Sequence, residues 1–454
     1  MTGLLLALLA LLALLVACEG KGGDDDYGTG PQVFSEPTVH IGDSWLFSST
    51  RINRISLTID FEGMRILRSE RRFSYPRNKV RAAAFIDDED VGDVGVRLRG
   101  GLGSFARIDG KPKLEIDFNE FSGERFYGLE SLSLNSMIFG CDGTREALAF
   151  ASYDLAGLAT SRTGYAQVFV NGQDYGMYLV LETQDDRWLR RNFVDGSGNF
   201  YDGKYVFTGF WLRTIDFDVG RDDWFDLEEG TDVGFTDIAR ISGGVKRARV
   251  LGRIDPSFWP LVDWEQLVTL LRVEQWTGNH DSYGTGSNNY RVYFEPGRPL
   301  VMSPWDTDGA FPSAWIEGED PDASRNVSFD PDGWEYPSGA LAQVCLDDPT
   351  CRQLWDEQGS WVQERLSDGT LYDLALDLAV LTEEGMTGDP RRECRAKDVL
   401  GDQDAILDYL EQGELPRGKD GGGGKDCSHL DQRGGLWLSL GLLGLLGLRR
   451  RPLT

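Results

Sequence analysis

The sequence predicts an α+β fold with mixed sheets, a central β-hairpin and a helical C-terminal region. Residues 51–100 alternate apolar and polar side chains around turns, which is typical of β-strands. Residues 290–302 form an apparent hairpin, in which Glu295-Pro296-Gly297-Arg298 supplies the turn. Residues 339–412 have helical character and predict two or three packed helices.

Composition limits the classes of function that this chain can have. Its 454 residues suffice for one large or two smaller domains, and its 41% hydrophobic content indicates a packed core. The formal net charge of -28 disfavours binding to nucleic acid, because phosphate backbones attract basic surfaces. With only three histidines in the chain, a histidine-rich zinc site is excluded.

Both ends of the chain are typical of an exported protein. Residues 1–17 predict a signal peptide, and Leu15-Val16-Ala17-Cys18 resembles a bacterial lipobox, in which Cys18 receives lipid. An ordinary signal peptide with an incidental cysteine is the alternative. Residues 18–32 read as a flexible tether, residues 33–412 as the folded body and residues 413–433 as a Gly-rich linker.

Residues 434–454 combine a short apolar stretch with Arg449-Arg450-Arg451. Together with Cys427 they resemble a C-terminal sorting tag of the myxobacterial type. The basic end is expected to stay in the cytoplasm, so the body would lie outside it. The chain is therefore expected in the cell envelope or at the cell surface, held at the membrane by a lipid anchor and this C-terminal segment.

Six cysteines and no C-x-x-C pair are present, so a zinc ribbon or a thioredoxin motif is absent. Cys345 and Cys351 are close enough in sequence for a short-loop disulfide. Cys141 and Cys394 would then form the remaining pair in an oxidising compartment.

Several elements can be placed in order. Val96–Leu98 and Leu114–Phe118 predict two strands joined by the glycine-containing stretch RGGLGSFARIDGKP. Residues 144–159 predict a helix, and Asp263 is expected to cap another that runs through Trp276. Residues 195–235, rich in Asp, Gly and aromatic residues, are interpreted as an irregular insertion.

The hairpin should bring a set of polar residues to its open end. These residues are Asp281, Asn288, Asn289, Asp306 and Asp308. Carboxylates and carboxamides are hard oxygen ligands, which suit Mg²⁺ or Mn²⁺. The order of loop Asp, Asn, hairpin and Asp is also that of protein-kinase catalytic sites. The spacing differs from H-R-D-x-x-x-x-N, and W-D-T-D stands where D-F-G would be.

This segment resembles the signature of the CotH family, the spore-coat-type atypical protein kinases. The matching features are Asn-x-Asp at Asn279–Asp281, NNYRVYF and PWDTD. The upstream stretches VRLRGGLGSFARIDGKPKLEIDF, GTREALAF and VFVNGQDYGMYLVLE resemble further family blocks in the family's order. The resemblance covers roughly residues 80–310 and implies an atypical protein-kinase-like fold.

The resemblance also implies roles for individual residues. Asp281 would receive the proton of the acceptor hydroxyl, while Asn288 or Asn289 and Asp306 would hold metal, with Asp308 as a reserve ligand. Lys113 falls on the family's Pro-Lys position and would contact the phosphates of ATP, with Glu182 as its carboxylate partner. Arg99, together with Arg97 on the same strand face, is an alternative phosphate ligand.

The resulting expectation is an ATP- and Mg²⁺- or Mn²⁺-dependent phosphotransferase that acts on Ser or Thr of envelope or surface proteins. The main alternative is a non-catalytic, adhesin-like binding protein that retains the fold. A glycosidase that uses Asp281 and Asp306 as its two carboxylates is a third possibility. It would leave the asparagines and Lys113 without a role.

Overall fold

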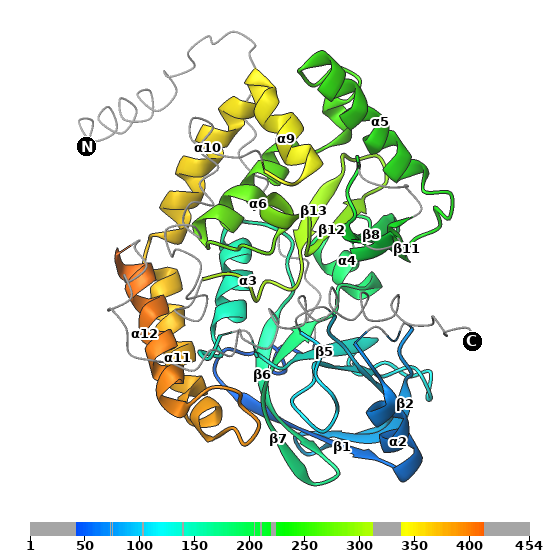
Figure 1. Cartoon of the computed structure of the whole chain (residues 1–454), viewed down its shortest axis with the longest axis vertical. Helices are drawn as coiled ribbons and strands as arrows, with labels where there is room; N and C mark the ends of the chain where they lie inside the picture. Colours follow the sequence, from blue (N-terminus) through cyan, green and yellow to red (C-terminus); the bar gives the residue numbers. More distant parts are fainter. Residues whose placement is uncertain are drawn as a thin grey trace, which may run out of the picture. The chain divides into compact units, whose positions relative to one another are not determined.

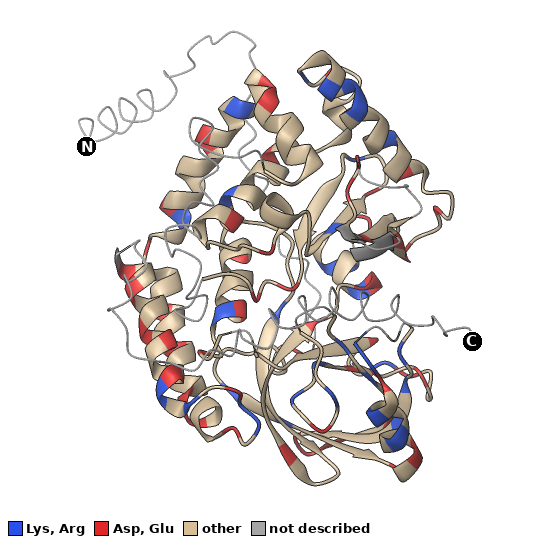
Figure 2. Ribbon diagram, viewed as in Figure 1, with Lys and Arg blue, Asp and Glu red and all other residues tan. Residues whose placement is uncertain are grey.

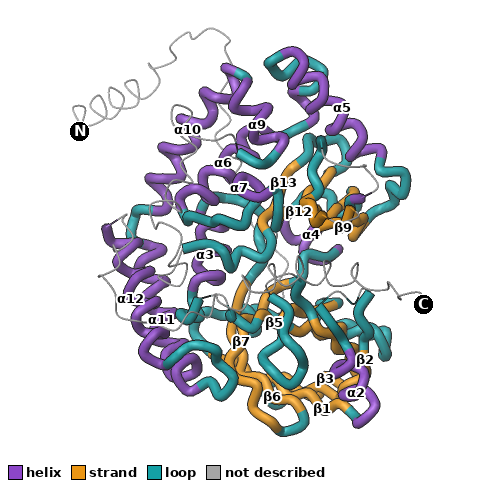
Figure 3. The backbone as a smooth tube through the Cα atoms, viewed as in Figure 1, coloured by secondary structure: helices purple, strands orange, loops and turns teal. Residues whose placement is uncertain are grey.

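Seven strands of the first half of the chain close into a β-barrel (Figures 1 and 3). In chain order the strands are β1 (Ile52–Ile59), β2 (Val80–Ile86), β3 (Glu89–Leu98), β4 (Leu114–Asp117), β5 (Ser131–Asn135), β6 (Thr163–Val170) and β7 (Gln173–Glu182). The order around the barrel is β1-β2-β3-β4-β5-β7-β6. Neighbours are antiparallel except at the closure, where β1 pairs with β6 in parallel. Leu, Ile and Val side chains that point inward every second residue fill the barrel.

The computed structural model describes residues 42–311 and 337–412, apart from residues 73, 75, 102–103, 139, 204, 209–210 and 219–223. These residues all belong to one compact unit, Phe34–Thr454. The predicted signal peptide, tether, linker and sorting segment lie outside the described residues.

Residues 51–100 contain a helix that the strand prediction missed. Helix α2 (Phe61–Ser69) begins at Asp60, whose side chain accepts a hydrogen bond from the Gly63 N–H at 2.7 Å. Met64 and Leu67, three residues apart, are buried against the barrel, while Phe61 is exposed. The apolar spacing within this short segment is therefore that of a helix.

The predicted hairpin is confirmed and belongs to a four-stranded sheet in the order β11-β8-β12-β13. Its strands are β12 (Tyr290–Phe294) and β13 (Val301–Pro304), and the flanking strands are β8 (Asn199–Gly203) and β11 (Asp226–Glu229). The interpretation of residues 195–235 as irregular is thus wrong, since this region also contains the ribbon of β9 (Tyr205–Thr208) and β10 (Trp211–Thr214). The alternation of Tyr290, Val292 and Phe294 with other residues is typical of a half-buried strand, but β12 pairs on both sides and all five of its residues are buried.

Helices form the rest of the described chain. They are α3 (Arg145–Leu155), α4 (Asp186–Asn192), α5 (Thr236–Leu251), η2 (Trp259–Leu261), α6 (Trp264–Trp276), α7 (Tyr283–Gly286), α9 (Ala340–Asp347), α10 (Pro349–Leu366), α11 (Thr370–Gly388) and α12 (Ala396–Gln412). The predicted helices near residues 144–159 and 263–276 are confirmed, and the Asp263 side chain caps α6. The described part of residues 339–412 contains four helices and not two or three, because short turns divide the pattern.

Helices α3, α11 and α12 join the barrel through one apolar cluster. α10 packs on α6, whereas α11 packs on α12, α3 and β7. Met177 and Leu179 of β7, Leu148 of α3 and Leu378 of α11 are among its buried members. This cluster fixes α3 between the barrel and the C-terminal helices (Figure 1).

Both predicted cysteine pairs are confirmed as disulfides. Cys141–Cys394 has a Cα–Cα distance of 6.1 Å, and Cys345–Cys351 has one of 5.0 Å. Acidic residues are numerous along α11 and α12 (Figure 2), in keeping with the net charge of the chain. Within the described part of the chain, no helix has the length and apolarity needed to cross a membrane.

Candidate active site

The open end of the hairpin brings the predicted polar residues together. The strand register pairs Tyr290 with Pro304, so Asn289 and Trp305 leave the sheet opposite each other. The Trp305 N–H donates to the Asn289 carbonyl oxygen at 3.0 Å. Asn289 and Asp306 have φ values of 52° and 47°. Asn and Asp are the side chains that best tolerate this left-handed region, and such residues are frequent at functional sites.

Asp281 is held by the two asparagines that follow it. Asn288 Nδ2 donates to Asp281 Oδ1 at 2.9 Å, and Asn289 Nδ2 donates to Asp281 Oδ2 at 3.0 Å. Asn289 Nδ2 also donates to the Asp281 carbonyl oxygen at 2.7 Å. The carboxylate is thereby fixed in direction while its half-exposed side chain stays open to a reactant. No hydrogen bond between described residues ends on Asn288 Oδ1, so this oxygen is available as a ligand.

The loop that carries Asp281 is supported from α6 and from the segment after Asp308. Glu274 of α6 accepts a hydrogen bond from the Gly284 N–H at 2.9 Å, and burial raises the pKa of Glu274 to about 7. The His280 N–H donates to the Gly309 carbonyl oxygen at 3.4 Å. A Cβ at position 309 would lie 3.0 Å from Asn279 Oδ1, so glycine permits this close approach.

Lys113 bridges the two aspartates beyond the hairpin. Its Nζ lies 2.8 Å from Asp306 Oδ1 and 3.0 Å from Asp308 Oδ2. The side chain of Lys113 is 7% exposed, and that of Asp306 is 34% exposed. Burial favours the neutral amine, but Asp306, Asp308 and Glu146 outweigh it and raise the pKa of Lys113. Burial and the neighbouring Asp306 charge raise the pKa of Asp308 to about 7. Asp306 and Asp308 therefore share one ammonium group, that of Lys113, which the sequence analysis had paired with Glu182.

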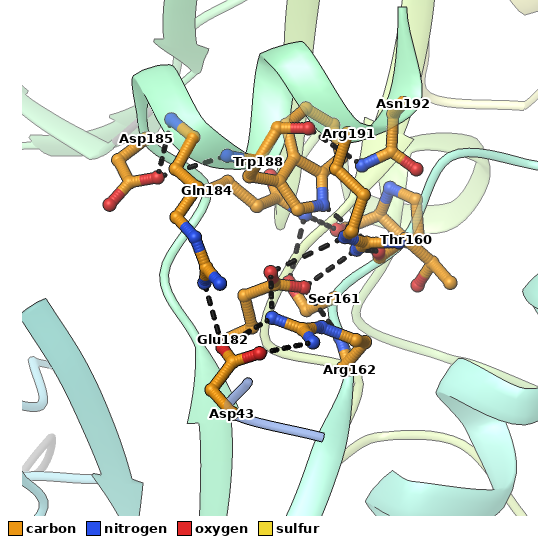
Figure 4. Close-up of polar contacts among 12 residues, drawn as sticks. Asp43, Thr160, Ser161, Arg162, Glu182, Gln184, Asp185, Trp188, Arg191 and Asn192 are labelled. Atoms are coloured by element: carbon orange, nitrogen blue, oxygen red, sulfur yellow. Dashed lines mark hydrogen bonds and ion pairs between the residues drawn. The ribbon is translucent and has the colours of Figure 1, made fainter. Parts of the chain in front are cut away.

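The predicted partnership of Lys113 with Glu182 is wrong. Glu182, at the end of β7, pairs with Arg162 at 2.7 Å and with Arg191 of α4 at 2.6 Å (Figure 4). Arg162 also pairs with Asp43 at 3.0 Å, so Glu182 belongs to a separate ion-pair network that joins the barrel to α4. Burial opposes ionisation of Glu182, but the two guanidinium groups outweigh it and lower its pKa.

Glu146 is the acidic residue that sequence reasoning missed. It lies in the first turn of α3 and is 4% exposed. Asn135 Nδ2 donates to Glu146 Oε2 at 2.5 Å, while Glu146 Oε1 has no hydrogen-bond partner among the described residues. Burial, together with the charge of Asp308, raises the pKa of Glu146, and Lys113 opposes this rise. The available signal was an acidic residue inside GTREALAF, a helix whose other side chains are largely apolar.

Arg99 borders the site from the barrel side. Its guanidinium lies 3.6 Å from Glu115 and donates to Ser133 Oγ. It also lies 5.2 Å from the centre of the Trp305 ring, which precedes Asp306. Arg97 pairs with the same Glu115 at 2.7 Å, so both arginines already have a carboxylate partner.

Comparison with known proteins places the chain in a family. A family model described as CotH kinase protein matches residues 96–412, which is more than half of the sequence. This chain belongs to the CotH kinase family. A search of curated proteins finds no match.

The CotH match spans every member of the site, from Lys113 and Glu146 to Asp306 and Asp308. Within the described residues, no group of three His, Cys, Asp or Glu side chains could hold a metal by itself. A Mg²⁺ ion bound through one or two carboxylates and substrate phosphates does not need such a group. Asp306 and Asp308 pair with the single ammonium of Lys113, and Glu146 adds a third acidic group whose charge raises the pKa of Lys113. This excess of negative charge, with Asn288 Oδ1 nearby in sequence, fits a hard divalent cation.

Proposed function

We propose that this CotH-family protein transfers a phosphoryl group from ATP to Ser or Thr hydroxyls of envelope or surface proteins. The proposal is carried by one observation: Lys113 of the barrel bridges Asp306 and Asp308, which follow the hairpin that presents Asp281. A basic group, two carboxylates and an oriented aspartate are the parts that phosphoryl transfer requires.

Each residue has a defined task in the proposed reaction. Asp306, Asp308 and Asn288 would hold Mg²⁺ or Mn²⁺, and Asn289 would orient Asp281. Lys113 and Arg99 would contact phosphate oxygens, while Glu146 would keep Lys113 charged and in place. The bound metal ion would supply positive charge to the phosphate oxygens.

The chemistry balances around Asp281. The bond between the γ-phosphorus and the ADP oxygen breaks, and a bond from phosphorus to the acceptor Oγ forms. The hydroxyl proton passes to Asp281, whose carboxylate oxygens can only accept when ionised. Asn288 and Asn289 limit the rotation of this carboxylate, so one oxygen can face the acceptor.

We also propose that the protein is exported and anchored by lipid at Cys18, with the C-terminal segment as a second membrane contact. The two disulfides support an oxidising location, because disulfides persist mainly outside the cytoplasm.

Incubation of the purified chain with labelled ATP and Mn²⁺ or Mg²⁺ tests the proposal. We expect label on Ser or Thr of the protein itself or of added envelope proteins, and no label with Asp281→Asn. Equal labelling by wild type and Asp281→Asn would contradict the role of Asp281. If the wild type neither transfers phosphate nor binds ATP, the adhesin-like alternative would be favoured.

A further inference from the structure

The linker between α11 and α12, residues Asp389–Arg395, is tied to the stretch that leads into Lys113. Lys111 Nζ pairs with Asp389 at 2.5 Å, and the side chains of the pair are 2% and 0% exposed. The Met177 N–H of β7 donates to the same Asp389 oxygen at 3.0 Å. A Cβ on Gly176 would lie 2.1 Å from Asp389 Oδ1, and Gly176 has a φ of 86°. The barrel wall is thus shaped to receive the Asp389 carboxylate.

The same linker holds the loop just before Lys111. Arg391 NH1 donates to the carbonyl oxygens of Asp109 at 3.2 Å and Gly110 at 2.5 Å. The Arg391 guanidinium also lies 3.4 Å from the centre of the Tyr175 ring. Residues 109–111 are therefore fixed to the linker by backbone and side-chain contacts, and only Pro112 separates them from Lys113.

A second set of contacts ties this C-terminal region to the start of α3. Cys394 of the linker is bonded to Cys141, and Asp402 of α12 accepts a hydrogen bond from the Cys141 N–H at 3.0 Å. Gln403 Nε2 donates to the Asp142 carbonyl oxygen at 2.9 Å. Asp142 in turn pairs with Arg145 at 2.9 Å, one residue before Glu146.

The third member of the site is reached through Arg145. Arg145 NH1 donates to the Ala310 carbonyl oxygen at 3.2 Å, two residues after Asp308. Lys113, Glu146 and Asp308 come from three segments that are distant in sequence. All three segments are fastened, directly or through one residue, to residues 389–403.

We propose that Asp389 is a positioning residue for phosphoryl transfer, acting through Lys111 to place Lys113 between Asp306 and Asp308. The Cys141–Cys394 disulfide holds the linker for this purpose and sets the start of α3. This inference rests on the proposed kinase function and adds to it a part for the C-terminal helices, which contribute no residue to the site itself.

A purely structural ion pair and a positioning pair respond differently to neutralisation. Removing one partner leaves a buried uncompensated charge, so Asp389→Asn and Lys111→Met should each lower the Tm. The double variant K111M/D389N buries no charge and should recover most of the Tm. If the ion pair positions Lys113, kcat in the double variant should stay at least tenfold below wild type, with a smaller change in the KM for ATP.

The disulfides offer a matched control. C141S/C394S releases the linker, whereas C345S/C351S opens a bridge between α9 and α10 that lies in a different apolar cluster. Both should be assayed well below their melting temperatures. We expect kcat to fall in C141S/C394S and to remain within twofold of wild type in C345S/C351S.

Hydrogen exchange measured on the full chain separates this inference from the kinase proposal. In K111M/D389N, amides of Leu114–Asp117 should exchange faster than in wild type, while those of α6 should not change. A stable double variant with wild-type kcat, or with unchanged exchange in Leu114–Asp117, would overturn the positioning role. An inactive wild type would instead refute the kinase function, and the positioning role in phosphoryl transfer would fall with it.

Discussion

Lys113 pairs with Asp306 and Asp308, and Glu146 is a third acidic side chain whose charge acts on its ammonium, although one ammonium can neutralise only one carboxylate. Of the two aspartates that pair with Lys113, Asp306 is more exposed than Asp308, whereas Glu146 is buried. The more exposed carboxylate of Asp306 is suited to bind a metal ion, and the buried carboxylate of Glu146 is suited to raise the pKa of Lys113. In the proposed mechanism, this difference in burial gives different tasks to residues of the same chemical type.

Glu146→Gln tests this assignment at the residue scale. The change removes the charge near Lys113 and keeps the hydrogen bond from Asn135 within reach. We expect kcat/KM to fall at least tenfold, which corresponds to about 1.4 kcal/mol of lost transition-state stabilisation. Stability should not fall, because burial of the carboxyl group is itself costly. Kinetic assays and thermal melts check this, and normal activity with a lowered Tm would contradict it.

Local patterns predicted the residues of the site better than their partners. Asp281, Asn288, Asp306 and Asp308 are close in sequence, and a single hairpin brings them together. Glu146 comes near enough to influence the charge of Lys113 only because the barrel closes and α11 packs against α3. The sequence does not reveal that Glu182 meets two arginines, nor that Glu146 lies near enough to Lys113 to influence its charge.

The connection between the barrel and α4 is the element-scale feature with the clearest electrostatics. Asp43 pairs with Arg162 and Arg187. Glu182 pairs with Arg162 and Arg191 (Figure 4). Burial opposes ionisation of both carboxyl groups, but the neighbouring guanidinium groups favour it more strongly. The pKa of Asp43 therefore lies below its ordinary value of 3.8, and that of Glu182 below 4.5. The network thus joins β6 and β7 to the helix that precedes the second sheet.

This network predicts an acid-sensitive contribution to stability. Because the folded pKa values are lowered, the contribution is complete above about pH 5 and is lost as the pH falls through the folded values. Urea midpoints measured between pH 7 and pH 3 should fall, and less steeply in Glu182→Gln. At pH 7 this variant should lose about 1–3 kcal/mol, because the partly buried guanidinium groups of Arg162 and Arg191 lose a partner. A variant with the same acid slope as wild type would contradict the assignment.

Element boundaries show which sequence signals were sufficient. α6 and α3 were predicted because a capping aspartate or a regular apolar stripe is visible locally. β8 and β11 were missed because their pairing partner, β12, lies far away in sequence, and their region is rich in Asp and Gly. α2 was missed because only two buried side chains mark its face within a stretch of strands.

At the scale of the whole molecule, four parts of the chain contribute to one candidate site. The barrel supplies Lys113, and α3 supplies Glu146. The loop before the hairpin supplies Asp281 and Asn288, and the segment after it supplies Asp306 and Asp308. The strands of residues 51–100, the hairpin and the helical C-terminal region predicted the α+β class, but the closed barrel depends on the β1–β6 pairing over more than a hundred residues. Such long-range closure leaves no local pattern.

Export is a prediction about the whole chain. We expect the mature protein to begin at Cys18, with lipid on its sulfur, because Leu15-Val16-Ala17-Cys18 ends an apolar stretch. Mass spectrometry of the protein from the membrane fraction checks this. Detection of an intact Met1, or of an unmodified Cys18, would contradict it.

The central claim is that Asp306 and its neighbours bind the metal–nucleotide complex while Asp281 serves the acceptor. Calorimetric titration of ATP with Mg²⁺ or Mn²⁺ into wild type, Asp306→Asn and Asp281→Asn tests it most directly. We expect metal-dependent binding in wild type, at least tenfold weaker binding in Asp306→Asn, and nearly unchanged binding in Asp281→Asn. Equal affinity of wild type and Asp306→Asn for ATP in the presence of metal would contradict the account.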